Sequence, residues 1–300
     1  MRAALLVFFT GCQPAPPPLS GDVPESLKAA HQAWVTEDLD ALTAAIHDTL
    51  SDAPTPAVAH NAVSLLETAF QHHPRLPADL SLPPGVHRLA LDHVHRSGPD
   101  GHRYRLVVAA LVDGPERLED LRVSGPGLVS DRRTATWTVT PEDGGHYVEL
   151  ELPDTPAPPA PGLYELTLSG PDGDAHLWTI LGADVATEVP RVATPTPGQV
   201  FVDTAPQVAV EVEATPEHVD GEPVGYGLWL ATVPDHSPVW SDWVEVDTSA
   251  SEDTHRVDID ADLTPGRYWL AVSRREVRHL GPVSLGRVAR RGVPFEVRAP

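Results

Sequence analysis

The chain has 300 residues, and its 43 acidic residues outnumber the 21 basic residues, which gives a formal net charge of −22. So acidic a chain repels the phosphate backbone, which excludes nucleic acid as an expected partner. A single cysteine excludes an intrachain disulfide, and the length suits two domains of about 100–150 residues plus a smaller segment.

Residues 1–11 are predicted to be a secretion signal that ends before Cys12. Arg2 gives a positive start, and the apolar run at 3–9 is too short to span a bilayer, which takes about 20 residues. The order Phe9-Thr10-Gly11-Cys12 resembles a bacterial lipobox. The resemblance implies cleavage before Cys12 and its acylation, with palmitate as a typical chain, and the absence of Asp at position 13 implies the outer membrane. An unmodified cysteine is the alternative.

Residues 12–23 form a proline-rich tether after the cysteine. Prolines favour extended polyproline geometry, so this spacer measures roughly 30 Å at ~3.1 Å per residue. We expect it to hold a folded body away from a surface.

Residues 24–74 are predicted to be helical. Pro24 suits a first helical position, Asp38 can cap a second helix, and Thr55-Pro56 is a start signal for a third. The segment weakly resembles tetratricopeptide-type helical hairpins but holds too few repeats for a solenoid. We expect a small helical cap on the next domain.

After a linker at 75–85, the hydrophobic period changes from helical to alternating. About seven short strands fit in 85–184 and about seven more in 189–300, separated by Gly, Pro and Asp turns. The fold expected is mainly β: a small N-terminal helical segment followed by two tandem antiparallel β-sandwiches.

Two similar motifs, "APGLYEL" and "TPGRYWL", occur near the start of a late strand in each of the two predicted sandwiches. They resemble the tyrosine corner of immunoglobulin-like and fibronectin type III domains, which implies that Tyr164 and Tyr268 bond back to the chain upstream. "VGYGLWLAT" and "VWSDW" resemble strands C and C′ of fibronectin type III modules. The resemblance implies a fold and not a function.

No familiar catalytic or cofactor motif occurs in the sequence, so we expect a non-enzymatic protein without a cofactor. His93 and His95 share one strand face, with His87 and His102 nearby, but no further residue completes a zinc site, so half-exposed strand histidines are expected.

Asp258, Asp260 and Asp262 alternate with apolar residues and should lie on one strand face. Calcium binds such oxygens, but the EF-hand glycine and glutamate are missing, so a solvated face is expected.

The segment 272–293 is rich in arginine and is predicted to be a long F–G excursion at one end of the second sandwich. One hypothesis is a patch that binds an acidic glycan, phosphate or an acidic partner protein, with the candidate residues Arg275, Arg278, Arg290 and Arg291. The alternative is a twisted hairpin whose arginines pair with the chain's own carboxylates.

Tryptophans form the second candidate surface. If Tyr268 and Leu270 face the core, Trp269 faces outward, and the same alternation turns Trp229 outward on a neighbouring strand. Trp240 or Trp243 would lie close by. Such indoles stack on sugars or anchor protein partners, unless another part of the chain covers them.

These features favour a cell-envelope lipoprotein that displays non-catalytic binding or adhesion modules, anchored to the membrane through its N-terminal lipid, with a glycan or an envelope protein as partner. One alternative is a structural or assembly subunit that docks through helices 24–74. Another is a hydrolase whose site is assembled only in space.

Overall fold

The computed structural model describes residues 23–98, 101–142, 144–182, 191–202, 207–211, 225–233, 238–245, 254–258 and 263–299. The predicted signal and nearly all of the tether lie outside these ranges, as do Asp260 and Asp262, and of Asp258 only the backbone is described. The expected carboxylate face therefore lies outside the described residues.

The N-terminal segment forms the three expected helices, α1 (Glu25–Val35), α2 (Leu39–Ser51) and α3 (Pro56–His72). The Asp38 side chain accepts a hydrogen bond from the Ala41 amide at 3.1 Å, and Thr55 accepts one from Val58 at 3.4 Å, so both predicted caps are confirmed. Apolar side chains of all three helices join the first hydrophobic core. The helices are thus a cap packed on the β structure, as expected.

The rest of the described chain is mainly β, with one short 3₁₀ turn, η1 (Pro115–Arg117). Its strands are β1 (Arg75–Leu76), β2 (Val86–Gly98), β3 (Gly101–Val112), β4 (Asp120–Gly125), β5 (Leu128–Ser130), β6 (Thr136–Glu142), β7 (Gly145–Glu151), β8 (Gly162–Gly170), β9 (Gly173–Leu181), β10 (Arg191–Thr194), β11 (Gln199–Val202), β12 (Gln207–Glu211), β13 (Gly225–Thr232), β14 (Pro238–Glu245), β15 (Thr254–Asp258), β16 (Gly266–Leu280) and β17 (Val283–Arg298). Alternation predicted most of them, but β1, β5 and β10 are too short to show a period, and the parts of β16 and β17 within 274–293 were expected to be a loop.

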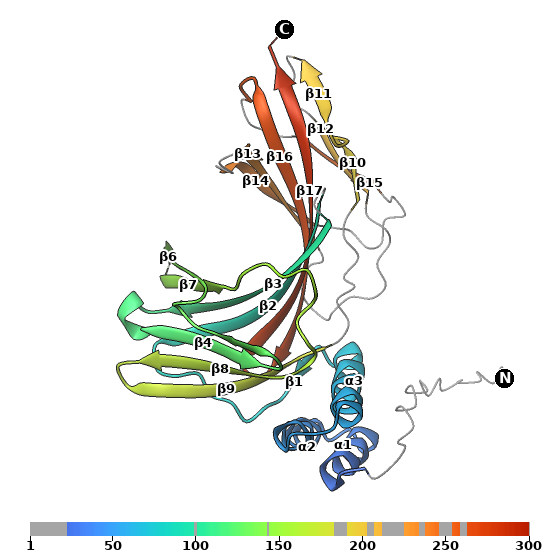
Figure 1. Ribbon diagram of the computed structural model, residues 1–300, viewed down its shortest axis with the longest axis vertical. Helices are drawn as coiled ribbons and strands as arrows, with labels where there is room; N and C mark the ends of the chain where they lie inside the picture. The colour runs from blue at the N-terminus through green and yellow to red at the C-terminus, as the bar shows by residue number, and fades with distance from the viewer. Residues whose placement is uncertain are drawn as a thin grey trace, which may run out of the picture.

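The strands do not divide into two separate antiparallel sandwiches. A ten-stranded sheet runs in the order β14-β13-β16-β17-β2-β3-β7-β6, with β1 on β16 and β11 on β17. The sheet is mixed, because β17 pairs in parallel with β2, β11 pairs in parallel with β17, and β1 pairs in parallel with β16. The long β16–β17 hairpin therefore belongs to both halves of the molecule (Figure 1).

Two smaller sheets complete the two hydrophobic cores. The four-stranded sheet β5-β4-β8-β9 covers the lower part of the large sheet, and the three-stranded sheet β10-β12-β15 lies beside its upper part (Figure 1). The tip of the hairpin gives Leu280, Val283 and Leu285 to the first core, and its base gives Tyr268 and Phe295 to the second. One hairpin thus connects the two cores.

Both predicted tyrosine corners are present. The Tyr164 hydroxyl donates to the Ala160 carbonyl at 2.8 Å, and the Tyr268 hydroxyl donates to the Thr264 carbonyl at 2.7 Å. Each bond fixes the chain just before a strand that crosses a core.

The large sheet bends where the hairpin passes from one core to the other. Both cores lie against the same side of the sheet, so its other side is the inner, concave side of the bend (Figure 1). We call this side the hollow face. Within the described residues, no helix has the length and apolar character needed to cross a membrane.

Candidate functional site

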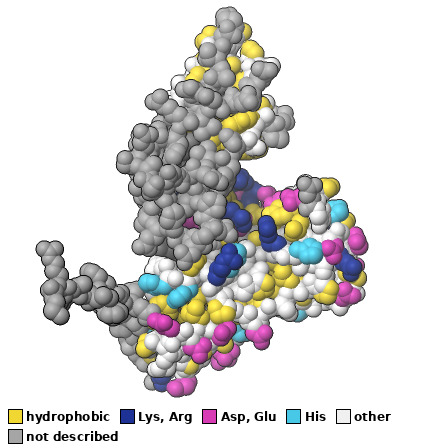
Figure 2. All heavy atoms as spheres, turned by 180° about the vertical axis from the view of Figure 1, so that it is seen from behind, with side chains coloured by type: hydrophobic (Ala, Val, Ile, Leu, Met, Phe, Trp, Pro, Cys, Tyr) yellow, Lys and Arg dark blue, Asp and Glu magenta, His cyan; other side chains and the backbone are white. Residues whose placement is uncertain are grey.

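Three arginines from three neighbouring strands lie in one row on the hollow face. Arg290 of β17 is the register partner of Arg96 of β2, and Arg96 is the partner of Arg103 of β3. Strands lie about 4.8 Å apart, so the three side chains start within about 10 Å of one another. Figure 2 shows basic side chains gathered in the angle between the upper arm and the lower body.

The two outward tryptophans lie on the same face, next to this row. Trp229 is the partner of Ala271, and Ala271 is the partner of Gly292, two residues beyond Arg290 on the same strand. The Trp269 indole lies over Gly292, because a Cβ there would come within 1.9 Å of its Cζ2. Both indoles are half-buried. The outward orientation predicted for Trp229 and Trp269 is therefore present.

Carboxylates hold a fourth arginine beside the row. The Arg105 guanidinium donates to Asp154 Oδ1 at 2.8 Å and also pairs with Glu151. Arg96 lies farther from Asp154, at 3.6 Å, and its buried Nε has no hydrogen-bond partner within the described part of the chain. Burial, together with the neighbouring Arg105, lowers the pKa of Arg96.

Arg290 forms no ion pair within 4 Å among the described residues. Burial and the nearby Arg96 lower its pKa, while Glu151 and Glu149 act in the opposite direction. Burial also raises the pKa of Glu149, and so does the adjacent Glu151. Two arginines, Arg290 and Arg96, therefore lie close together here, and two glutamates, Glu149 and Glu151, lie close together beside them.

Two further features of the hollow face carry no net charge: the Tyr147 phenol, and an ion pair between Arg275 and Asp92. Burial, followed by Glu149, raises the pKa of Tyr147 to about 12, so its phenol stays protonated at neutral pH. Arg275 donates to Asp92 at 2.9 Å. This candidate arginine is therefore neutralised within the chain.

The other candidate arginines lie on the opposite side of the sheet. Arg278 and Arg287 both bind Glu67 Oε2 of α3, at 2.6 and 2.5 Å, and Arg291 is half-buried on this same side. Arg274 is buried beside Glu276, at 2.9 Å. The prediction of an F–G loop at 272–293 is therefore wrong. The segment is a hairpin inside the sheet, and several of its arginines pair with the chain's own carboxylates.

Trp240 does not join the other two tryptophans. It is the register partner of Leu230, a core residue, and packs against the second core. The side chain of Trp243 lies outside the described residues. The expected third indole on the hollow face is thus not supplied by Trp240.

The histidines form a pair and a buried single residue. His95 Nε2 lies 2.9 Å from His102 Nδ1, and the His95 ring stacks on Tyr104. His93 is only 6% exposed, not half-exposed as expected, and burial lowers its pKa to about 4. No group of three or more potential metal ligands occurs in the parts of the chain that the structure describes.

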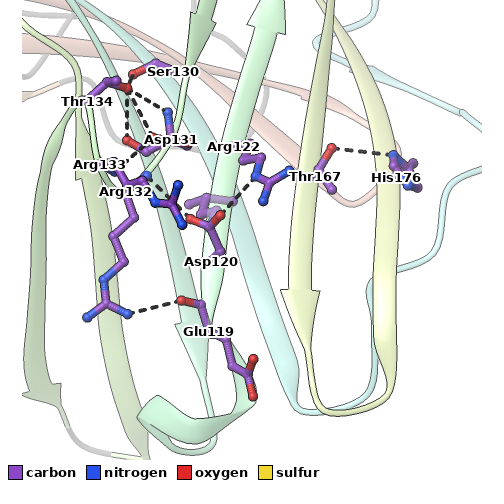
Figure 3. Close-up of polar contacts among 11 residues, drawn as sticks. Glu119, Asp120, Arg122, Ser130, Asp131, Arg132, Arg133, Thr134, Thr167 and His176 are labelled. Atoms are coloured by element: carbon purple, nitrogen blue, oxygen red, sulfur yellow. Dashed lines mark hydrogen bonds and ion pairs between the residues drawn. The ribbon is translucent and has the colours of Figure 1, made fainter.

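The exposed side of the four-stranded sheet carries a different polar network (Figure 3). Arg122 Nε donates to Asp120 Oδ2 at 2.9 Å, and the Arg132 amide donates to Asp120 Oδ1 at 3.4 Å. His176 lies 2.7 Å from Glu165. Because these charges are paired locally, this surface is a weaker candidate than the hollow face.

An apolar cavity of about 490 Å³ lies at one end of the first core, under residues 153–160. Its walls include Leu106, Leu128 and Tyr164. Arg105 is the charged residue among its described lining, and its guanidinium is already bound to Asp154.

No protein-family model and no curated protein matches the chain. Among solved structures, a crystal structure of titin domains Z1Z2 in complex with telethonin aligns at 16% identity over 72% of this chain and 96% of that one, with a TM-score of 0.21. A chimeric titin Z1Z2 carrying an exogenous decorin peptide aligns at 15% identity over 73% and 99%, with a TM-score of 0.24.

Sequence reasoning selected Arg290 but missed Arg96 and Arg103. These two residues stand on either side of "SGPDGH" in the sequence, and alternation places both on the side opposite His95. That signal was present in the sequence. Nothing in the sequence indicated that β2 pairs with β17, the last strand of the chain.

Proposed function

We propose that this protein is a cell-envelope lipoprotein, anchored in the bacterial outer membrane, that presents a non-catalytic binding surface on its hollow face. Support for the anchor comes from the lipobox-like sequence at Cys12 and the proline-rich spacer after it. Two half-buried indoles and an arginine row on one concave face support a binding role.

The observation that carries the proposal is the shared hairpin. Because β16 and β17 run through both cores, Trp229 and Trp269 from one half lie beside Arg96 and Arg103 from the other half. A surface built on packed strands is held more rigidly than one on loops, which lowers the entropy cost of binding. Assembly through the helices has less support, because their apolar faces are used in the first core.

Replacement of the cysteine tests the anchor. The Cys12→Ser protein should leave the membrane fraction in cell fractionation, whereas Thr10→Ser, which keeps a small residue before the cysteine, should stay there. A Cys12→Ser protein that still sediments with membranes would show that the anchor proposal is wrong.

The binding surface is testable in the same background, because Cys12→Ser removes the only cysteine. Ser241, the exposed partner of Trp229, is changed to cysteine and coupled to a polyethylene glycol maleimide. The coupled protein should no longer co-sediment with isolated cell envelopes. The matched control, Asp174→Cys at an exposed position of β9, should co-sediment after coupling as the uncoupled protein does. Equal co-sedimentation of both coupled proteins would argue against the hollow face.

A further inference from the structure

The arginine row carries more positive charge than its surroundings neutralise. Arg105 uses Glu151 and Asp154, and Arg96 reaches Asp154 only at 3.6 Å. Arg103 is exposed, and neither it nor Arg290 forms an ion pair with a described residue. Four guanidinium groups thus face two contacting carboxylates, and inclusion of the more distant Glu149 still leaves a surplus positive charge.

Two other groups of charges near the row do not change the balance on the hollow face. Arg275 and Asp92 bind each other and are mutually neutral. Arg287, on the opposite side of the sheet, shares Glu67 with Arg278. The surplus therefore belongs to Arg96, Arg103 and Arg290.

The spacing of the row suits one compact anion with several oxygens. Three guanidinium groups that start within about 10 Å of one another, on long side chains, can converge on one group. A phosphoryl group offers three acceptor oxygens and close to two negative charges at neutral pH, and guanidinium forks match its geometry. A carboxylate offers two oxygens and one charge.

We propose that Arg96, Arg103 and Arg290 bind a phosphoryl group, so that the hollow face takes a phosphorylated ligand. This inference rests on the proposed function, because it assumes that the hollow face is the binding surface. Arg290 supplies a partly buried guanidinium, Arg103 an exposed one, and Trp229 an apolar neighbour for the rest of the ligand.

The test is a calorimetric titration of the full-length Cys12→Ser protein with inorganic pyrophosphate. Arg290→Gln should weaken binding about tenfold or more, because it removes a charge-assisted hydrogen bond, and Arg103→Gln should weaken it less. Arg298→Gln is the matched control, since Arg298 lies on the same strand and the same side but about 26 Å away, and it should change the affinity less than about twofold. High salt should weaken binding of the unaltered face.

Vesicle flotation distinguishes the source of the phosphoryl group. Flotation with vesicles of phosphatidylcholine and phosphatidic acid, but not with phosphatidylcholine alone, would point to a lipid headgroup; binding of pyrophosphate without flotation would point to a soluble or glycan-borne phosphate. Both results support the site if they depend on Arg290. A melting temperature measured for each variant shows whether it is folded, and the exposed Arg103→Gln variant tests the site even if Arg290→Gln unfolds.

Two results would overturn the inference: no binding of either phosphorylated probe, or an equal loss in Arg298→Gln. Failure of the proposed function looks different. If coupling at Ser241 blocks envelope binding while pyrophosphate does not bind, the surface remains and the phosphoryl group is wrong. If pyrophosphate binds through Arg290 but no envelope binding is found, the proposed function is wrong.

Discussion

Replacement of Glu67 by glutamine should weaken the attachment of α3 to the hairpin. Glu67 Oε2 accepts bonds from Arg278 at 2.6 Å and from Arg287 at 2.5 Å, which come from the two strands of the hairpin. The three side chains are 20%, 16% and 20% exposed, so water replaces little of a lost contact. Glutamine keeps the shape and one acceptor oxygen but removes the charge.

The size of the effect follows from the two bonds. A hydrogen bond to a charged group contributes about 1.5–3 kcal/mol and a neutral one about 1 kcal/mol. Loss of the charge at both bonds should therefore lower the free energy of unfolding by about 1–4 kcal/mol. For a chain of this size, that corresponds to a melting temperature lower by about 2–6 °C.

Urea unfolding followed by circular dichroism measures this change. The matched control is Glu25→Gln, since Glu25 pairs with Lys28 at 3.1 Å but the two side chains are 89% and 55% exposed, so the effect should stay below about 0.5 kcal/mol. If Glu67→Gln unfolds at the same urea concentration as Glu25→Gln, the arginine pair does not hold the helix to the hairpin. Glu67→Leu combined with Arg278→Met and Arg287→Met should recover much of the loss, because it removes the buried charges together.

Three further outcomes follow from single side chains. Burial lowers the pKa of His93 to about 4, below its usual 6.5, so the stability that the neutral ring contributes is present above pH 6.5 and is lost as the pH falls towards 4. Between pH 7 and pH 4.5, urea unfolding should show that the parent loses about 2–3 kcal/mol more free energy of unfolding than His93→Gln does. Equal losses in the two proteins would contradict this. Tyr164→Phe should cost about 1 kcal/mol, since the hydroxyl donates to the Ala160 carbonyl at 2.8 Å, and an unchanged urea midpoint would count against the corner. Gly292→Ala should displace the Trp269 indole and increase acrylamide quenching of the tryptophan fluorescence, and unchanged quenching would show that the indole does not lie over this glycine.

Much of the local structure was predictable because local chemistry decides it. Asp38 and Thr55 cap helices because their side-chain oxygens satisfy free amides in the first turn, and this requires no distant partner. Tyr164 and Tyr268 were recognisable for the same reason, since each bonds to a carbonyl four residues upstream.

The candidate site was only half predictable. Alternation turned Trp229 and Trp269 outward, and the arginine-rich composition of 272–293 selected Arg290, but the same composition also selected Arg275 and Arg278 as free cations. Their partners, Asp92 and Glu67, lie far away in the sequence. Whether an arginine is neutralised depends on these distant carboxylates, which no local spacing indicates.

The sequence by itself determined most of the longer strands and which side of each of them faces a core, because the side-chain period of a strand is two residues. Only the tertiary structure decided that β17 lies beside β2. Strands pair through backbone N–H and C=O groups, which are the same in every strand, so the pattern of apolar side chains does not indicate which strand will be the neighbour. That pairing joins the two cores and brings Arg290 beside Arg96 and Arg103.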